Sequence, residues 1–357
     1  MSVDTFTIPV QRVEKSRISE VDFDNLQFGK TFSDHMFVVD YKDGVWQDPQ
    51  VLPYGNMSLS PATSSLHYGQ ALFEGMKAYK DANGDLLLFR PLANLKRLNS
   101  SAERLCMPEL PEELFMQGLE QLLRLDAAWV PSKAGSSLYI RPLMFATDDF
   151  IGVRPSLTYR FLIIAGPVGK YYDVPVKVAV EPNYVRSAEG GAGYAKAAGN
   201  YAAALLPTRK MQEKGYDQLI WTDAKEHKYV EESGTMNVMF VIDDVLITPS
   251  LSTSILHGVT RDSVLQVAKD LGYKVEERKV AVEEVIEAHK AGKLQEAFGT
   301  GTAAIISQIA LIHYNGQDYE LPPVEGRKVS NQVAIELDKI RTGQAPDKHN
   351  WVYKVSL

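Results

Sequence analysis

Residues 190–206 read GGAGYAKAAGNYAAALL and surround a single lysine, Lys196, with mostly small side chains. This stretch interrupts a series of short predicted strands. A lysine becomes a nucleophile when its surroundings lower its ordinary pKa of about 10.4, and imine formation needs open space around the reacting carbon. The small neighbours of Lys196 provide that space. A solvated lysine at the start of a helix is the alternative interpretation, so the rest of the chain has to decide.

The two halves of the chain on either side of this stretch have different patterns. In the first half we expect a hairpin of strands 72–79 and 86–89 around DANGD, helices from Pro91 and over 111–129, and strands at 136–146 and 159–166. In the second half, short strands dominate, and helices are expected near 200–213, 260–271, 281–290 and 326–342.

These patterns predict an α+β protein with two lobes. A single core seldom grows beyond about 250 residues, and this chain has 357 residues. We expect a smaller N-terminal α/β domain over 1–169, an interdomain linker over 170–181 and a larger cofactor-binding domain over 182–357. The second domain is expected to be a β-rich, distorted barrel with helices outside.

Composition narrows the class of protein. The net charge of −7 argues against a nucleic-acid or membrane-surface partner, and no apolar leader or bilayer-spanning segment is visible. Cys106 is the only cysteine, and the seven histidines show no close ligand spacing, so neither a disulfide framework nor a metal site is expected. We expect a cytoplasmic enzyme or binding protein.

Three further segments hold the groups that a pyridoxal phosphate site requires besides a lysine. These groups are a carboxylate for the pyridine nitrogen, a cation, and backbone amides for the phosphate. Strand alternation in YVEESGTMNVMF sends Glu231 and Glu232 to opposite faces, so one can point inward. Thr260 opens a helix whose N-terminus favours an anion, although it could instead serve only as an N-cap. The turn in AFGTGTAA, 297–304, can hold an anion with successive amides.

That same turn matches the loose dinucleotide fingerprint G-x-G-x-x-A, which raises a nicotinamide-dependent oxidoreductase as an alternative. Only 53 residues follow Ala304, too few for the βαβαβ unit that gives the fingerprint meaning, and the next segment reads as a strand. A non-catalytic ligand-binding protein is the other alternative.

Seven ordered motifs together resemble the branched-chain amino acid aminotransferases, which are fold-type IV pyridoxal phosphate enzymes. The motifs are FGKTFSDHM (28–36), LHYGQALFEGMKAY (66–79), LYIRPLMF (138–145), GGAGYAKAAGNY (190–201), EESGTMN (231–237), GVTRD (258–262) and FGTGTAA (298–304). The resemblance runs nearly end to end. It implies transamination of L-leucine, L-isoleucine and L-valine with 2-oxoglutarate.

The resemblance also assigns the cofactor site. Lys196 corresponds to the aldimine lysine and proton-transfer base, Tyr201 to the phenol beside the cofactor's phenolic oxygen, and Glu232 to the acid at the pyridine nitrogen. Arg97 corresponds to the phosphate-binding arginine. The other cofactor-binding residues implied are Arg186, Thr235, Leu256, Val259, Thr260 and Thr302.

The implied substrate pocket is apolar but still accepts glutamate. Its lining includes Phe28, Tyr68, Phe73, Gly75, Tyr139 and Ala303, with Val153 contributed by the partner subunit of a homodimer. Thr302 and Ala303 would hold the α-carboxylate through backbone amides. Arg141, Tyr68 and Tyr139 would meet the second carboxylate of glutamate or 2-oxoglutarate.

Some positions depart from the family pattern. Ala304 and Ser307 stand where mammalian members carry a CxxC pair, and Ala198 and His257 replace a common glycine and proline. Within the same fold, a D-amino acid transaminase or an aminodeoxychorismate lyase shares the lysine, the acid and the phosphate site, and is the alternative to the branched-chain enzyme.

Overall fold

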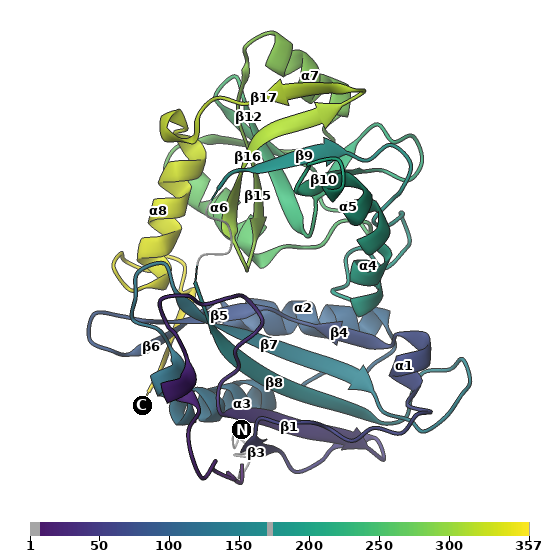
Figure 1. Ribbon diagram of the computed structural model, residues 1–357, viewed down its shortest axis with the longest axis vertical. Helices are drawn as coiled ribbons and strands as arrows, with labels where there is room; N and C mark the ends of the chain where they lie inside the picture. The colour runs from purple at the N-terminus through teal and green to yellow at the C-terminus, as the bar shows by residue number, and fades with distance from the viewer. Residues whose placement is uncertain (1–7, 170–173, 357) are drawn as a thin grey trace. The chain divides into compact units, whose positions relative to one another are not determined.

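The computed structural model describes residues 8–169 and 174–356. The chain forms two compact units (Figure 1). Unit 1 comprises Met1–Tyr171, Ala195–Ala198 and Ile340–Leu357, and unit 2 comprises Tyr172–Tyr194 and Gly199–Lys339. The piece of chain that carries Lys196 therefore belongs to unit 1, although the segments on both sides of it belong to unit 2.

Unit 1 is built on one antiparallel sheet. Its strands run in the order β18-β6-β5-β7-β8-β1-β2, with β3 paired to β1 and β4 paired to β7. Their bounds are β1 His35–Lys42, β2 Val45–Trp46, β3 Gln50–Pro53, β4 Ala71–Phe73, β5 Met76–Lys80, β6 Leu86–Phe89, β7 Ser137–Ala146, β8 Tyr159–Val168 and β18 Val352–Val355.

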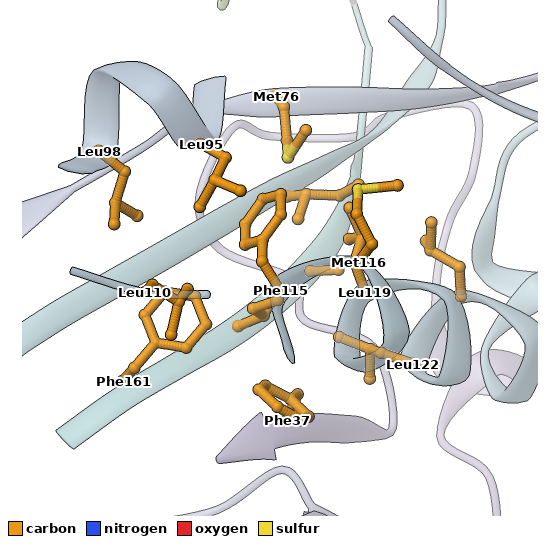
Figure 2. Packing of buried hydrophobic residues seen from close by; sticks show 14 of the residues in the cluster. Phe37, Met76, Leu95, Leu98, Leu110, Phe115, Met116, Leu119, Leu122 and Phe161 are labelled. Carbon is orange, nitrogen blue, oxygen red and sulfur yellow. The ribbon is translucent and has the colours of Figure 1, made fainter. Parts of the chain in front are cut away.

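Two amphipathic helices pack on this sheet (Figure 1). They are α2 (Pro91–Arg104) and α3 (Glu112–Leu125), and the shorter elements of unit 1 are η1 (Ile18–Glu20), α1 (Ser64–Tyr68) and η2 (Ala127–Trp129). Figure 2 shows Phe115 and Leu119 of α3 meeting Phe37 of β1 and Phe161 of β8 in one apolar cluster. Burial of these side chains stabilises the unit by removing apolar surface from water.

Alternation along β7 decides which side chains face away from that core. Leu138, Ile140 and Met144 belong to the apolar cluster beneath the helices. Successive side chains of a strand point to opposite faces, so Tyr139 and Arg141 lie on the other face of the sheet. Two predicted substrate residues thereby lie on the face of β7 opposite the apolar cluster.

Unit 2 contains a closed barrel. Strands β9, β10, β11, β12, β15 and β16 pair in a ring, because β11 pairs with β12 as well as with β10; β13, β14 and β17 extend it. Their bounds are β9 Val176–Val180, β10 Gln218–Thr222, β11 Val230–Ser233, β12 Met236–Ile242, β13 Val245–Thr248, β14 Lys274–Glu277, β15 Leu294–Gly301, β16 Ile305–Tyr314 and β17 Gln317–Glu320.

Helices accompany this barrel. They are α4 (Ala198–Ala203), α5 (Leu205–Gln212), α6 (Val259–Asp270), α7 (Val282–Lys290), η3 (Val324–Gly326) and α8 (Val329–Arg341). The start of α8 is fixed by Glu296 of β15, whose carboxylate accepts hydrogen bonds from the backbone N–H groups of Val329 and Ser330, each at 2.8 Å. A carboxylate is favourable there because it meets the positive end of the helix dipole.

The predicted α+β fold with a distorted barrel is confirmed, and most predicted elements are present. Two details differ. The run 72–79 is split into β4 and β5 at Glu74 and Gly75, and the helix predicted near 200–213 is the pair α4 and α5.

The division into domains at 170–181 stays a prediction, and the two compact units differ from it. Residues 176–180 form strand β9 of the barrel, and residues 170–173 lie outside the described part of the chain. The predicted order of sizes also differs, because Ala195–Ala198 and Ile340–Leu357 count with unit 1.

We predict that Gly118→Ala destabilises the protein. A methyl group at Gly118 would lie 2.6 Å from the ring of Phe37, which is fully buried. Overpacking costs about 1–3 kcal/mol, which exceeds the gain of up to about 1 kcal/mol from alanine in a helix. The urea midpoint of unfolding should fall. Gly55→Ala, which meets nothing within 4 Å, is the control, and an equal or higher midpoint for Gly118→Ala would contradict the packing described.

Candidate active site

The backbone of Lys196 is pinned to the sheet and to α2 of unit 1. Its N–H donates to Ser101 Oγ at 2.9 Å, and its C=O accepts the N–H of Phe73 at 3.1 Å. Next to it, Ala197 forms a β-bridge with Leu72. The side chain is half-buried, with Nζ 4.8 Å from the centre of the Phe73 ring. The lysine is therefore held on an ordered frame beside an aromatic face.

A buried ion pair lies next to this frame. Arg97 Nε donates to Glu74 Oε1 at 2.7 Å, and Arg97 Nη2 donates to Glu74 Oε2 at 2.8 Å. Arg97 lies on α2, and its side chain is only 9% exposed. Glu74 is the partner that the sequence reasoning missed. A single acid inside the apolar run LFEGM was the available signal, because a buried charge needs a partner.

The carboxyl group of Glu74 is held in its ionised form. Burial alone would raise its pKa, but the charges of Arg97 and Lys196 and the hydrogen bonds from Arg97 and Asn94 outweigh burial and lower the pKa below its usual value. A lowered folded-state pKa contributes stability above the pKa of the unfolded chain. That contribution is lost as the pH falls through the folded-state pKa.

Five predicted substrate residues meet on unit 1. Arg141 Nη2 donates to the Tyr139 hydroxyl at 2.8 Å, and the guanidinium lies 4.5 Å from the Phe73 ring centre. The rings of Phe28 and Tyr139 are 4.8 Å apart in an edge-to-face arrangement. A Cβ at Gly75 would lie 2.4 Å from the Tyr139 hydroxyl oxygen, so only glycine fits there without a shift of that side chain.

This cluster combines aromatic walls with an unsatisfied cationic group. Arg141 Nε is buried and has no hydrogen-bond partner among the residues that the structure describes. A buried donor without a partner is costly, and an anion is the partner that best satisfies a guanidinium. The arrangement therefore suits a ligand with an apolar part and a carboxylate.

Two other predicted substrate residues are exposed on unit 1. Tyr68 is 43% exposed and Val153 is 90% exposed. The expected contribution of Val153 to the substrate pocket of a partner subunit stays a proposal.

In unit 2 the choice between the two glutamates is clear from burial and contacts. Glu232 is 2% exposed, and its carboxylate accepts the Leu256 N–H at 2.6 Å and pairs with Arg186 Nε at 2.9 Å. Glu231 points to the opposite face and accepts a short hydrogen bond from the Ser254 hydroxyl. Burial raises the pKa of Glu231 above its usual value. Glu232 is thus the ionic, charge-paired member.

Arg186 holds Glu232 and does not present a spare edge. Besides Nε, which pairs with Glu232, Nη1 donates to the Ser254 carbonyl at 2.9 Å and Nη2 to the Gly193 carbonyl at 3.0 Å. All three nitrogens are engaged by the protein. The geometry favours a role in orienting the carboxylate over the direct cofactor contact expected from the sequence.

A row of polar side chains continues from Glu232 across the barrel wall. Glu232 is in register with Asn237, and Asn237 with Thr300, so the three lie on one face. The side-chain amide of Asn237 donates to the Leu256 carbonyl at 2.9 Å, so Glu232 and Asn237 together hold the Leu256 backbone. Asn237 is a second residue that the sequence reasoning missed.

Helix α6 begins at Val259, directly after the segment that carries Leu256. Its N-cap is Gly258, and no side chain in the described part of the protein caps the helix. Thr260 lies inside the first turn, so its interpretation as the N-cap is wrong. A Cβ at Gly258 would lie 2.0 Å from Asn237 Oδ1, which explains the glycine. Val259 and Thr260 therefore stand at an uncapped helix N-terminus, where backbone N–H groups favour an anion.

The turn after β15 holds Thr302 and Ala303, and its backbone is strained. Ile305 has φ of 65°, which is unfavourable for a β-branched residue. Just before the turn, Thr300 Oγ1 is buried and finds no hydrogen-bond partner within residues 8–169 and 174–356. Of the remaining predicted residues, Tyr201 is half-buried in α4, and Thr235 is exposed in the turn between β11 and β12.

Each unit taken by itself carries groups that fit pyridoxal phosphate. Unit 1 supplies Lys196 and the buried Arg97, and unit 2 supplies the paired Glu232 carboxylate and the uncapped start of α6. A primary amine, a carboxylate and phosphate-binding cations and amides are what this cofactor requires. Among the residues that the structure describes, no group of His, Cys, Asp and Glu could hold a metal ion.

Comparison with known proteins agrees with this chemistry. Residues 71–312 match the amino-transferase class IV family. Branched-chain-amino-acid aminotransferase 2 of Bacillus subtilis (strain 168) is 46% identical over 339 residues, which cover 94% of this chain and 93% of the relative. The chain therefore belongs to the class IV aminotransferase family, and its relatives within it are branched-chain-amino-acid aminotransferases. Its cofactor is pyridoxal phosphate.

Solved structures give the same result. The branched-chain aminotransferase from the archaeon Thermoproteus uzoniensis, solved with norvaline, has a TM-score of 0.74 and 28% identity, with 90% of this chain and 100% of that chain covered. The branched-chain amino acid aminotransferase from Escherichia coli has a TM-score of 0.73 and 27% identity, with 91% and 99% covered. No helix in the described ranges is long and apolar enough to cross a membrane.

We predict that Glu232 and Glu231 differ sharply in function. Glu232→Gln should lower kcat by about 100-fold or more, because it removes the charge paired with Arg186, whereas Glu231→Gln should stay within about threefold. Aminotransferase turnover at saturating substrate measures both. The reverse order of effects would show that Glu231 holds the role assigned to Glu232.

Proposed function

We propose that the protein transfers the amino group of L-leucine, L-isoleucine or L-valine to 2-oxoglutarate, giving the branched-chain 2-oxo acids and L-glutamate. The cluster beside Lys196 carries this proposal. The rings of Phe73 and Tyr139 lie against the Arg141 guanidinium, whose Nε has no hydrogen-bond partner among the described residues, and Phe28 packs on Tyr139. One kind of substrate is apolar and the other has a second carboxylate, and this cluster offers surface for both.

Ligands of a similar solved structure support the same pair of substrates. A branched-chain amino acid aminotransferase that is 26% identical to this chain has been solved with N-(5'-phosphopyridoxyl)-L-glutamate and with 4-methylvaleric acid. The first ligand carries a glutamate, and the second is a branched, apolar chain ending in a carboxylate. Both kinds of ligand suit the aromatic and cationic surface of unit 1.

In the proposed reaction, Lys196 moves the proton between the substrate Cα and the cofactor. The bound pyridoxal phosphate supplies an electron-withdrawing ring that weakens the Cα–H bond. Glu232, which Arg186 orients through an ion pair, would hold a proton on the pyridine nitrogen and so maintain that withdrawal. Tyr201 is assigned to the phenolic oxygen, and Leu256 to one face of the ring, with Thr235 nearby.

Anion binding is divided among several groups. Arg97, with Val259, Thr260 and the Thr302 hydroxyl, is assigned to the phosphate. The amides of Thr302 and Ala303 are assigned to the α-carboxylate common to all substrates. Arg141 and the Tyr139 hydroxyl, which are already hydrogen-bonded to each other, are assigned to the second carboxylate of glutamate.

The alternatives have less support. The G-x-G-x-x-A turn lies between the antiparallel strands β15 and β16, so it does not open the helix that a dinucleotide site needs. A D-amino acid transaminase or an aminodeoxychorismate lyase shares the fold, but relatives at 45–47% identity over most of the chain are named as branched-chain aminotransferases.

We also propose that the active enzyme is a homodimer. Four apolar side chains of unit 1 are largely exposed: Leu66 and Ile151 at 65%, Leu157 at 67% and Val153 at 90%. Exposed apolar residues gathered on neighbouring segments commonly mark an interface. Val153 is expected to complete the substrate pocket of the partner subunit, and Tyr68, on the same helix as Leu66, is exposed beside it.

Lys196→Ala should abolish transamination while the protein stays folded. The variant removes the amine that binds the cofactor and moves the proton, so the rate of L-leucine conversion should fall by at least about 1,000-fold. Glutamate formation from L-leucine and 2-oxoglutarate measures it, with circular dichroism as the folding control. With the wild-type protein, L-leucine should react and D-leucine should not. A variant with substantial residual activity would rule out the proposed role of Lys196.

Val153→Asp should dissociate the proposed dimer and lower activity together. A charge at the centre of an apolar contact is costly to bury, so the dimer dissociation constant should rise by at least about tenfold. Analytical ultracentrifugation measures it, and Val45→Asp, at a valine that is 58% exposed, is the matched control. A wild-type protein that is fully active as a single chain would contradict the proposal.

A further inference from the structure

Glu74 is the most completely buried acid beside the site, and the reaction described above assigns it no role. Its side chain is 0% exposed. Besides the two bonds from Arg97, Oε2 accepts the side-chain amide of Asn94 at 2.9 Å and the N–H of Gly75 at 3.1 Å. Its own N–H donates to the Pro142 carbonyl at 2.8 Å, which fixes the backbone on β7. Both carboxylate oxygens are thus held from several sides.

A closed ring of contacts joins this carboxylate to Lys196. Phe73, the residue before Glu74, donates its N–H to the Lys196 carbonyl. The Lys196 N–H donates to Ser101 Oγ, and the Ser101 hydroxyl donates to the Arg97 carbonyl at 2.8 Å. Arg97 closes the ring through its two bonds to Glu74. All of these residues lie in unit 1.

The two-point ion pair determines the direction of the Arg97 guanidinium. Glu74 accepts hydrogen bonds from Nε and Nη2, which lie on one edge of the guanidinium. A planar guanidinium gripped on one edge is fixed in orientation, whereas a single contact leaves it free to rotate. The carboxylate also offsets the charge of Arg97 beside the amine of Lys196.

We propose that Glu74 is a positioning residue. Through its ion pair with Arg97, it orients the Arg97 guanidinium toward the phosphate of the cofactor that Lys196 binds. The inference rests on the proposed function, because the phosphate belongs to the cofactor of that reaction. Glu74 acts through Arg97 and has no contact with the substrate in this account. Its removal therefore affects ligands that carry a phosphate and spares those that do not.

The test compares two ligands that differ only in the phosphate. The dissociation constants of pyridoxal phosphate and of pyridoxal are measured on the apoenzyme by absorption titration, for the wild type and for Glu74→Gln. The side chain of glutamine has the same shape but a single acceptor oxygen, so it cannot grip both nitrogens. We expect at least a tenfold loss of affinity for pyridoxal phosphate and a change within twofold for pyridoxal.

Asp40→Asn is the matched control. Asp40 accepts two hydrogen bonds from Arg160 at the same two distances, 2.7 and 2.8 Å, on strands β1 and β8 of unit 1. This pair is not part of the ring of contacts that joins Glu74 to Lys196. This variant should leave both dissociation constants within twofold. In a double-mutant cycle, Glu74→Gln should add little to the loss caused by Arg97→Gln, because both remove the same interaction.

Several outcomes would overturn the inference. Equal losses for both ligands would indicate a general structural role, and unchanged affinities would remove the role altogether. Tighter pyridoxal phosphate binding by Glu74→Gln would show that the carboxylate competes with the phosphate for Arg97. If Glu74→Gln does not fold, Asn94→Ala decides instead: a loss confined to pyridoxal phosphate supports the inference, and no loss refutes it.

Failure of the proposed function has a different signature. In that case the wild-type protein itself would bind pyridoxal phosphate no more tightly than pyridoxal, or would not convert L-leucine. If the wild type requires the phosphate and converts L-leucine, but Glu74→Gln binds both ligands like the wild type, only the inference about Glu74 is wrong.

Discussion

The attachment of residues 195–198 to strand β4 is the contact on which the site of unit 1 depends. The Phe73 N–H to Lys196 carbonyl bond and the Leu72–Ala197 bridge place a short piece of chain from the second half of the sequence onto the sheet of the first half. Phe73, Tyr139 and Arg141 lie together on one face of that sheet. Small residues around Lys196 permit this attachment, since bulky side chains would keep the strand away.

Each unit contains a buried ion pair at its candidate site, and further hydrogen bonds hold that pair in place. Glu74 and Arg97 in unit 1 and Glu232 and Arg186 in unit 2 are all less than 10% exposed. Breaking such a pair by removing one partner typically costs about 3–5 kcal/mol, because it leaves an uncompensated buried charge. The pairs therefore fix orientation at a substantial cost in desolvation, which is what a site that binds a charged cofactor requires.

Local chemistry made much of this structure predictable from the sequence. The pair Asn83-Gly84 indicated the hairpin that β5 and β6 form, and Pro91 indicated the start of α2. The alternation of Glu231 and Glu232 indicated that only one would point inward, and burial then identifies Glu232. The strand that follows Gly301 was also expected, and it removes the dinucleotide interpretation of the turn.

What could not be predicted depends on tertiary contacts. The burial of Arg97 could not be predicted, because helical periodicity does not show that Glu74, between β4 and β5, pairs with it. Asn237 is polar within an apolar strand, and only the path of the 251–258 loop explains it. The assignment of 195–198 to unit 1 depends on pairing across more than 100 residues of sequence, which no local pattern encodes.

The visible absorption spectrum of the purified protein, with L-leucine and then 2-oxoglutarate added, tests the central claim most directly. The account predicts a yellow band from the cofactor on Lys196, which L-leucine bleaches and 2-oxoglutarate restores, so that both half-reactions are seen in one cuvette. A yellow band that ignores L-leucine would contradict the assignment of substrate, and no band after addition of pyridoxal phosphate would contradict the role of Lys196.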